Sequence, residues 1–182
     1  MKLLIVVDMQ HDFIDGALGS PEAQAIVPAV KEKIAQYVKD NQLVVFTRDT
    51  HFDNYLQTWE GKNLPVPHCI LGTPGWEIHK DLEVSEDFFQ IVNKVSFGYD
   101  AWTTWFEMQG YNISDYESIE LVGLCTDICV VSNAFLLKAF YPEVPISVDA
   151  SCCAGVTAAS HLNALEVMRG CQITITGVDD SE

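Results

Sequence analysis

Residues 3–8, LLIVVD, place an apolar run directly before an aspartate. A short, continuous apolar run rich in β-branched side chains is typical of a strand that is buried on both faces. The run breaks at Asp8 and no small-residue cleavage site follows it, so it is too short for a signal peptide or a membrane span. We therefore expect Leu3–Val7 to be a buried strand of a parallel sheet, with Asp8 at its carboxyl end.

Further runs of the same kind follow along the chain. They are Leu43–Thr47, Phe88–Val92, Ile119–Gly123, Pro145–Val148 and Gln172–Thr176. Segments with a helical spacing of apolar residues lie between them, at Ala23–Lys39, Asp127–Phe140 and Thr157–Arg169. This alternation predicts an α/β fold, a doubly wound and mostly parallel six-stranded sheet with helices on both faces. Because no linker, repeat or low-complexity tract interrupts residues 1–182, we expect a single domain.

Composition limits the partners of the chain. There are 26 Asp and Glu against 10 Lys and Arg, which gives a formal net charge of −16. Nucleic acid and anionic membrane surfaces would repel such a protein, so we expect neither as a partner. The cysteines have no regular spacing, which favours reduced thiols in a cytoplasmic protein over a secreted disulfide scaffold. Residues 51–87 are rich in turn formers without clear periodicity, and so long a loop is usually functional.

Chemically active side chains follow the predicted strands at their ends. They are Asp8 after the first strand, Asp49 and His51 after the second, Lys94 after the third and Cys129 after the fourth. Because open parallel sheets bind ligands at the carboxyl ends of their strands, these side chains are expected to meet at one edge. This convergence carries more weight than any one of the residues.

Cys129 lies in GLCTDICV, residues 123–130, just past the fourth predicted strand. Thr126 is placed to cap a helix there, which would put Cys129 in the first turn. In that position the helix dipole lowers the pKa of a thiol, and free N–H groups can receive an oxyanion. A small cysteine buried in the core is an equally good explanation of Cys129 alone, and a better one of Cys152, Cys153 and Cys171.

Asp8 and Lys94 are candidates to activate Cys129. A carboxylate at Asp8 can accept the thiol proton and return it to a leaving amine, and Lys94 can hold Asp8 ionised. Singly, Asp8 could cap the next turn and Lys94 could be a solvated surface lysine. Together the three form a nucleophile–base–orienter set of the kind used in acyl transfer. Phe13 would lie over the same edge, either as an aromatic wall for a flat substrate or as a core residue.

Asp49 and His51 also form the start of a metal-type group. His68, in PVPHCILGTPG (65–75), supplies a third donor from the long loop. One carboxylate and two imidazoles suit Zn²⁺, Fe²⁺ or Mn²⁺ in an open site, although from spacing alone the signal is weak. The remaining histidines lack such a context and are expected to be ordinary surface or helix residues: His11, His79 and His161.

Taken as a set, the motifs resemble the isochorismatase-like cysteine hydrolases, and within them the nicotinamidase/pyrazinamidase type. The motifs that carry the resemblance are DMQHDF (8–13), TRDTH (47–51), PHCILGTPG (67–75), Lys94, GLCTDICV (123–130) and VDASCCAG (148–155). The resemblance covers almost the whole chain. It implies hydrolysis of nicotinamide and pyrazinamide-like amides to the carboxylic acid and ammonia through a cysteine thioester, in NAD salvage.

The same resemblance implies roles for individual residues. Asp8, Lys94 and Cys129 would be the catalytic triad, and the N–H groups of Cys125 and Cys129 would form the oxyanion hole. The Leu124–Cys125 peptide would be cis, which no pattern of residues alone suggests.

The resemblance also implies a bound metal and a ring-binding wall. Asp49, His51 and His68 would hold one divalent metal, zinc ahead of iron or manganese, and this metal would bind the pyridine nitrogen. Phe13 would pack on the substrate ring. The family further suggests a homo-oligomer.

The chain departs from the family pattern around the pocket. Nicotinamidases commonly have an aromatic residue shortly before the metal-binding histidine, where this chain has Leu64, and Trp59 is the nearest aromatic replacement. We expect both to contact the substrate. Some members have an additional metal-binding histidine near the position of Gln57, and VSFGYDAW (95–102) also differs from the usual pattern.

Two other functions remain open. One is a related cysteine amidohydrolase that acts on an N-carbamoyl or ureido amide, although such a substrate has no evident use for the metal-type residues. The other is a non-catalytic, metal- or redox-responsive binding protein. An isochorismatase proper is disfavoured because it does not need Cys129.

Overall fold

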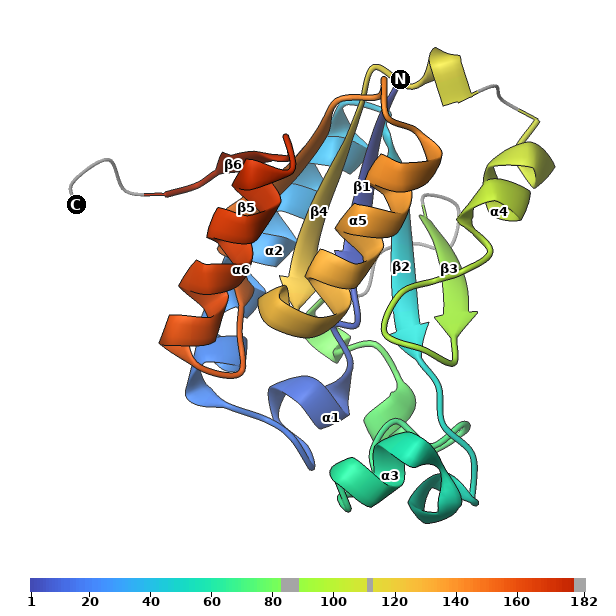
Figure 1. The fold of residues 1–182 in the computed structure, drawn as a ribbon, viewed down its shortest axis with the longest axis vertical. Coiled ribbons are helices and arrows are strands. Elements are labelled where there is room, and N and C mark those ends of the chain that lie inside the picture. Colours follow the sequence, from blue (N-terminus) through green and yellow to red (C-terminus); the bar gives the residue numbers. More distant parts are fainter. Residues whose placement is uncertain (83–88, 111–112, 179–182) are drawn as a thin grey trace.

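The computed structural model describes residues 1–82, 89–110 and 113–178. The strands form one sheet in the order β3-β2-β1-β4-β5-β6, and all neighbouring strands are parallel (Figure 1). The strands are β1 (Lys2–Val7), β2 (Leu43–Asp49), β3 (Phe89–Lys94), β4 (Ser118–Leu124), β5 (Ile146–Ala154) and β6 (Thr174–Thr176). The predicted α/β fold is confirmed, with a sheet that is parallel throughout.

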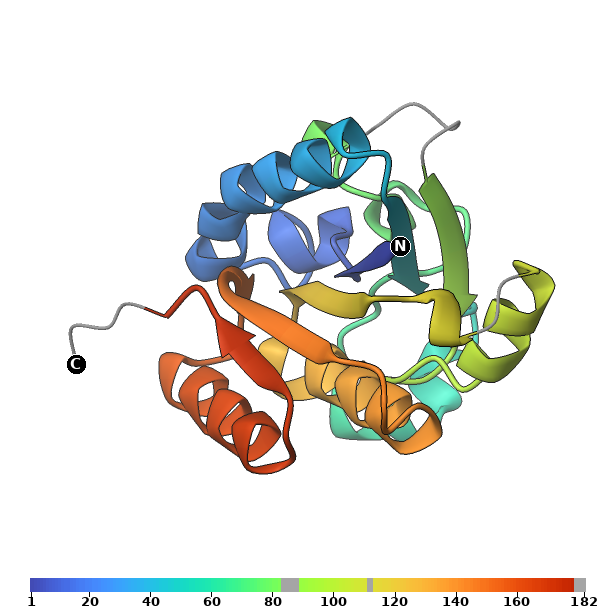
Figure 2. The same cartoon turned by 90° about the horizontal axis from the view of Figure 1, so that it is seen from above.

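Helices cover both faces of the sheet. They are α1 (His11–Ile14), α2 (Pro21–Lys39), α3 (Trp59–Asn63), α4 (Trp102–Met108), α5 (Val131–Phe140) and α6 (Ala158–Gly170). Seen from above, α2 lies on one side and α5 and α6 lie on the other (Figure 2). Alternate residues of β1 enter the two cores: Leu4 and Val6 pack with α2, whereas Leu3, Ile5 and Val7 pack with α4 and α5. No helix of the described residues is long and apolar enough to cross a membrane.

Several boundaries differ from the sequence expectation. β3 extends to Lys94, and Phe88 of the expected third strand lies outside the described residues. β5 continues to Ala154 because, after an irregularity in its pairing with β4, Gly123 pairs with Cys153. The expected loop after β2 contains short helical turns, which are η1 (Tyr55–Gln57), α3, η2 (Pro74–Trp76) and η3 (Lys80–Leu82).

The carboxyl end of β4 has a special backbone conformation. Gly123 has φ +115°, and a Cβ there would collide with the carbonyl oxygen of Val7. Only glycine tolerates both conditions, so this residue allows β4 to lie against β1 just before the cysteine-containing segment. Leu124–Cys125 is a cis peptide, as the resemblance implied. A π-helical turn, η6 (Thr126–Val130), then leads into α5; another turn, η5 (Ile113–Asp115), precedes β4.

Candidate active site

Asp8, Lys94 and Cys129 meet at the carboxyl ends of the central strands, and all three are buried. Nζ of Lys94 lies 2.7 Å from Oδ2 of Asp8 and 3.5 Å from Sγ of Cys129. The Thr47 hydroxyl donates a 2.6 Å hydrogen bond to Oδ1 of Asp8. Asp8 itself has φ +49°, so the chain turns sharply where β1 ends. The structure thus brings the three residues together, and their catalytic roles remain predictions.

Burial sets the protonation of this group. It raises the pKa of the Cys129 thiol well above its usual value, and the nearby Asp8 carboxylate acts in the same direction. The expectation of an acidified thiol is therefore wrong, because burial has the largest effect on this thiol and raises its pKa. Burial also raises the pKa of Asp8, against the opposing effect of the Lys94 ammonium. A protonated thiol must lose its proton before it can act as a nucleophile. The adjacent Asp8 carboxylate is placed to accept that proton.

Lys94 keeps its charge although it is buried. Burial by itself lowers the pKa of Lys94, but Asp8, Cys129 when it is a thiolate, and Asp49 reverse the sign and raise it. Its Nζ is also 3.3 Å from Oδ1 of Asp49. Lys94 is therefore a buried cation between two carboxylates, and it connects the cysteine to the metal-type group.

The turn that carries Cys129 differs from the expected capped helix. Cys125, and not Thr126, precedes the turn, and its side chain makes no capping hydrogen bond. The Thr126 hydroxyl instead lies 2.8 Å from Nδ1 of His161, which comes from α6. The prediction of a Thr126 cap is wrong because a tertiary partner takes the hydroxyl.

The predicted metal ligands Asp49, His51 and His68 form a second group beside the first. Oδ2 of Asp49 lies 3.0 Å from Nε2 of His51 and 3.8 Å from Nε2 of His68. Glu60 joins them from α3, with Oε1 3.5 Å from Nε2 of His51 and 3.7 Å from Nε2 of His68. Sequence reasoning missed Glu60 and looked instead to the exposed Gln57.

This donor set fits a divalent metal. Nε2 of His51 is buried and makes no hydrogen bond of good geometry with any described residue, although two carboxylates face it. Nδ1 of His68 lies 2.8 Å from the Val66 carbonyl oxygen, to which it donates, and this leaves Nε2 free to ligate. Two imidazole nitrogens and two carboxylates are ligands that Zn²⁺, Fe²⁺ and Mn²⁺ share.

The protonation of His51 predicts how metal affinity depends on pH. Burial by itself lowers the pKa of His51, but the facing carboxylates of Asp49 and Glu60 reverse this and raise it to about 9 in the metal-free protein. A proton on His51 competes with metal, so zinc affinity should fall about tenfold per unit as pH drops below that value, and level off above it. Competition titrations with a chelator across pH 6–10 (about four units) measure this. A pH-independent affinity would contradict the assignment.

The role of Glu60 as a metal ligand can be tested by comparison with Gln57, three residues earlier in the sequence. Glu60→Gln removes one negatively charged carboxylate ligand that faces both imidazoles, so zinc affinity should fall by about 10- to 100-fold. Gln57→Ala, in the adjacent turn, should leave the affinity unchanged. Isothermal titration of both variants decides the point, and equal affinities would exclude Glu60 from the metal group.

Two buried amides hold the groups in place. The Gln10 side chain clamps the backbone of Asp49, because its Nε2 donates to the Asp49 carbonyl at 2.9 Å and its Oε1 accepts from the Asp49 N–H at 2.7 Å. Nδ2 of Asn133 donates to the Cys129 carbonyl at 2.8 Å, and its Oδ1 accepts from the Trp102 indole at 2.9 Å. Both are fully buried. In the sequence, the position of Gln10 inside the DMQHDF motif was the one indication of this role, and Asn133 had none.

Of the expected substrate-contacting residues, Phe13 lies beside the metal-type group. The Phe13 ring is 5.4 Å from the His68 ring. Trp59 and Leu64 flank Glu60 on and after α3, with 81% and 37% of their surfaces exposed. Their contact with a substrate remains a prediction.

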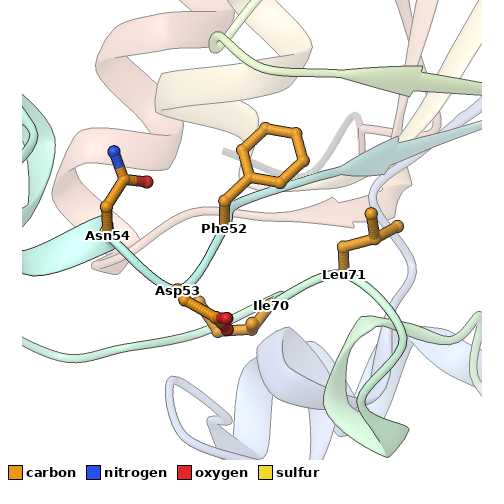
Figure 3. Close-up of a pocket in the computed structure, with 5 residues that line it drawn as sticks. All are labelled: Phe52, Asp53, Asn54, Ile70 and Leu71. Carbon is orange, nitrogen blue, oxygen red and sulfur yellow. The ribbon is translucent and has the colours of Figure 1, made fainter.

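A hollow of about 380 Å³ lies on the surface of the segment that follows β2. It is lined by Phe52, Asp53, Asn54, Ile70 and Leu71 (Figure 3). The catalytic set lies elsewhere, at the carboxyl ends of the strands, so we do not place the reaction in this hollow.

Known proteins are similar to this chain over nearly their full length. A nicotinamidase/pyrazinamidase of Mycobacterium tuberculosis is 29% identical over 196 aligned positions, which cover 96% of this chain and 98% of that protein. The crystal structure of a Pyrococcus horikoshii pyrazinamidase in complex with zinc has a TM-score of 0.81 at 28% identity, covering 97% of this chain and 99% of that one. An N-carbamoylsarcosine amidase from Thermoplasma acidophilum, at 23% identity and a TM-score of 0.77, covers 100% of this chain and 98% of its own, and shows the fold alone.

The isochorismatase domain model matches residues 2–180. This match extends through the whole sheet and both groups of buried polar residues. It confirms the resemblance that the sequence motifs indicated, and the full-length relatives include nicotinamidase/pyrazinamidase proteins. The chain therefore belongs to the isochorismatase family.

Proposed function

We propose that this protein is a cysteine amidohydrolase that converts nicotinamide, and pyrazinamide-like amides, to the carboxylic acid and ammonia. The observation that carries the proposal is the buried contact of Lys94 Nζ with both Asp8 and the Cys129 sulfur, at 2.7 and 3.5 Å. A buried thiol, carboxylate and ammonium in contact suit acyl transfer better than metal storage or redox sensing. The named relatives support the substrate class, and formation of the acid suits a role in NAD salvage.

In the first half-reaction, Asp8 accepts the Cys129 proton while Sγ bonds to the carboxamide carbon. The carbonyl π electrons move to oxygen, and the N–H groups of Cys125 and Cys129 hold this oxyanion. Each such donor typically contributes a factor of roughly 10² to 10³ in rate. Asp8 then passes the proton to the amide nitrogen, the C–N bond breaks, and ammonia leaves a thioester on Cys129.

In the second half-reaction, water replaces the amine. Asp8 takes a proton from water as the oxygen bonds to the thioester carbon, and the C–S bond then breaks. The carboxylic acid leaves and the sulfur recovers its proton from Asp8. Lys94 stays charged throughout, so it moderates the pKa of Asp8 in both steps.

Asp49, His51, Glu60 and His68 would hold the divalent metal. When bound, the ion supplies a Lewis acid that can take a ring nitrogen of the substrate. Phe13 would pack on the ring from the His68 side, and Trp59 and Leu64 would close the pocket from α3. This placement favours a pyridine or pyrazine carboxamide over an N-carbamoyl or ureido amide, which has no ring nitrogen to present.

An ammonia-release assay tests the proposal. Nicotinamide should be hydrolysed at a useful rate, benzamide, which lacks the ring nitrogen, should be hydrolysed far more slowly, and a chelator should reduce turnover of nicotinamide. Preferential hydrolysis of a ureido amide would instead assign the related amidohydrolase function. Failure to release ammonia from all three amides by the metal-loaded protein would favour the non-catalytic binding protein.

A further inference from the structure

A second group of metal-type side chains lies outside the Asp49 group. Nδ1 of His11 is 2.8 Å from Oδ1 of Asp15, and Nε2 of His79 is 3.5 Å from Oδ2 of the same carboxylate. The two imidazole rings lie side by side, with centroids 4.7 Å apart. One ligand atom from each residue falls within 4.8 Å of the others. We propose that His11, Asp15 and His79 form a second site for a divalent transition-metal ion of the zinc type.

The backbone positions these three ligands before any metal binds. His11 is the first residue of α1 and Asp15 directly follows the last residue of that helix, so their side chains lie one helical turn apart. His79 comes from a distant segment, but its N–H donates to the Met9 carbonyl at 2.9 Å and the His11 N–H donates to Glu77 at 3.0 Å. An isolated antiparallel bridge between Gln10 and Ile78 completes this connection. The ligands therefore converge because the two chain segments are hydrogen-bonded to each other.

The donor chemistry suits zinc. Two imidazole nitrogens and one carboxylate make the three-ligand set of an open zinc site, with metal–ligand distances of about 2.0–2.2 Å. Ligand atoms around such an ion lie roughly 3–3.5 Å apart, close to the 2.8 and 3.5 Å observed here.

Burial gives the site a fixed base and an open side. The His79 side chain is only 8% exposed, whereas that of Asp15 is 46% exposed. Nδ1 of His79 accepts a 3.4 Å hydrogen bond from the Asp81 N–H, which orients the ring so that Nε2 faces Asp15. Ligation through Nε2 would therefore displace the proton from that nitrogen. An ion can therefore enter from solvent and meet a held imidazole.

The alternative is a plain ion pair between His11 and Asp15 at helical spacing, with His79 as a buried ring beside it. That explanation accounts for the 2.8 Å contact. A neutral imidazole N–H of His79 could also face the same carboxylate, so the two explanations differ in whether the three side chains bind zinc. A metal ion would be held by all three side chains at once. The sequence expectation of an ordinary surface or helix histidine is wrong for His79, which is buried.

Zinc stoichiometry tests the proposal independently of the reaction. His51→Asn with His68→Asn removes two imidazoles from the Asp49 group, and this double variant is the background for the test. After equilibrium dialysis against zinc, the background protein should retain about one zinc ion per chain by metal analysis. Adding Asp15→Asn, at an exposed position that leaves the core intact, should remove this zinc. Adding His79→Asn should have the same effect.

A matched control uses another exposed acid. Asp53→Asn, in the hollow of Figure 3 and outside both groups, should leave the zinc content of the background unchanged. Circular dichroism confirms that each variant is folded. The proposal is overturned if the background protein binds no zinc, or if Asp15→Asn retains as much zinc as Asp53→Asn.

Discussion

Cys129→Ala should abolish ammonia release from nicotinamide, with a loss of about 10⁴-fold or more, because the acyl intermediate is proposed to form on its sulfur. The metal content should stay unchanged, since Cys129 is not among the four metal-type residues. Steady-state rates together with metal analysis measure both effects. The small cavity that the substitution leaves should cost only modest stability, so a folded but inactive protein is the expected result.

Cys153→Ala is the matched control for this substitution. Cys153 is a free cysteine that is also buried, shares a core cluster with Cys129, and has a pKa raised by burial. Its replacement should keep the rate within a few-fold of the unmodified protein, because its sulfur does not contact Lys94. If Cys129→Ala retained the activity of Cys153→Ala, the nucleophile assignment would fail.

Lys94→Met should damage both stability and activity. It leaves the Asp8 and Asp49 carboxylates buried without their shared cation, and breaking such a pair typically costs about 3–5 kcal/mol. Loss of the ammonium also removes what opposes the raised pKa of Asp8, so the carboxyl becomes protonated and cannot act as the base. Urea unfolding and the ammonia assay separate the two losses. Lys94→Met combined with Asp8→Asn should recover part of the stability and none of the activity.

Lys33→Met provides the comparison for an ion pair away from the site. Nζ of Lys33 lies 3.0 Å from Glu120 and 2.7 Å from Asp149, but its side chain is 20% exposed. Because water screens this cluster, its loss should destabilise the protein less than Lys94→Met does, and the rate should be nearly unchanged. An active Lys94→Met protein, or an inactive but folded Lys33→Met protein, would contradict the role given to Lys94.

The fold was predictable because its strands are local and strongly apolar. Most strand cores are short, mainly apolar runs, as in β1, although β4 contains Glu120 and β5 contains Asp149. The helices between them have an apolar stripe, as in α2. The rule that parallel strands end at one edge then placed Asp8, Lys94 and Cys129 together. These inferences need only strand order and direction, both of which the pattern supplies.

The remaining features depend on tertiary contacts that no local pattern encodes. Glu60 reaches the two imidazoles only because short turns fold the segment after β2 back over the sheet edge. The raised pKa of the Cys129 thiol arises chiefly from burial among distant segments, which the local helical position does not reveal. The buried His79 pairs with α1 through a bridge between residues far apart in sequence.

Trapping the acyl intermediate tests the central claim most directly. The protein is mixed with excess nicotinamide, quenched in acid during the first turnovers and analysed by intact and peptide mass spectrometry. We predict a nicotinoyl group on the peptide that contains Cys129, which hydroxylamine removes as expected for a thioester, and its absence from Cys129→Ala. An active protein that never carries the nicotinoyl group, or carries it on another residue, would contradict the account.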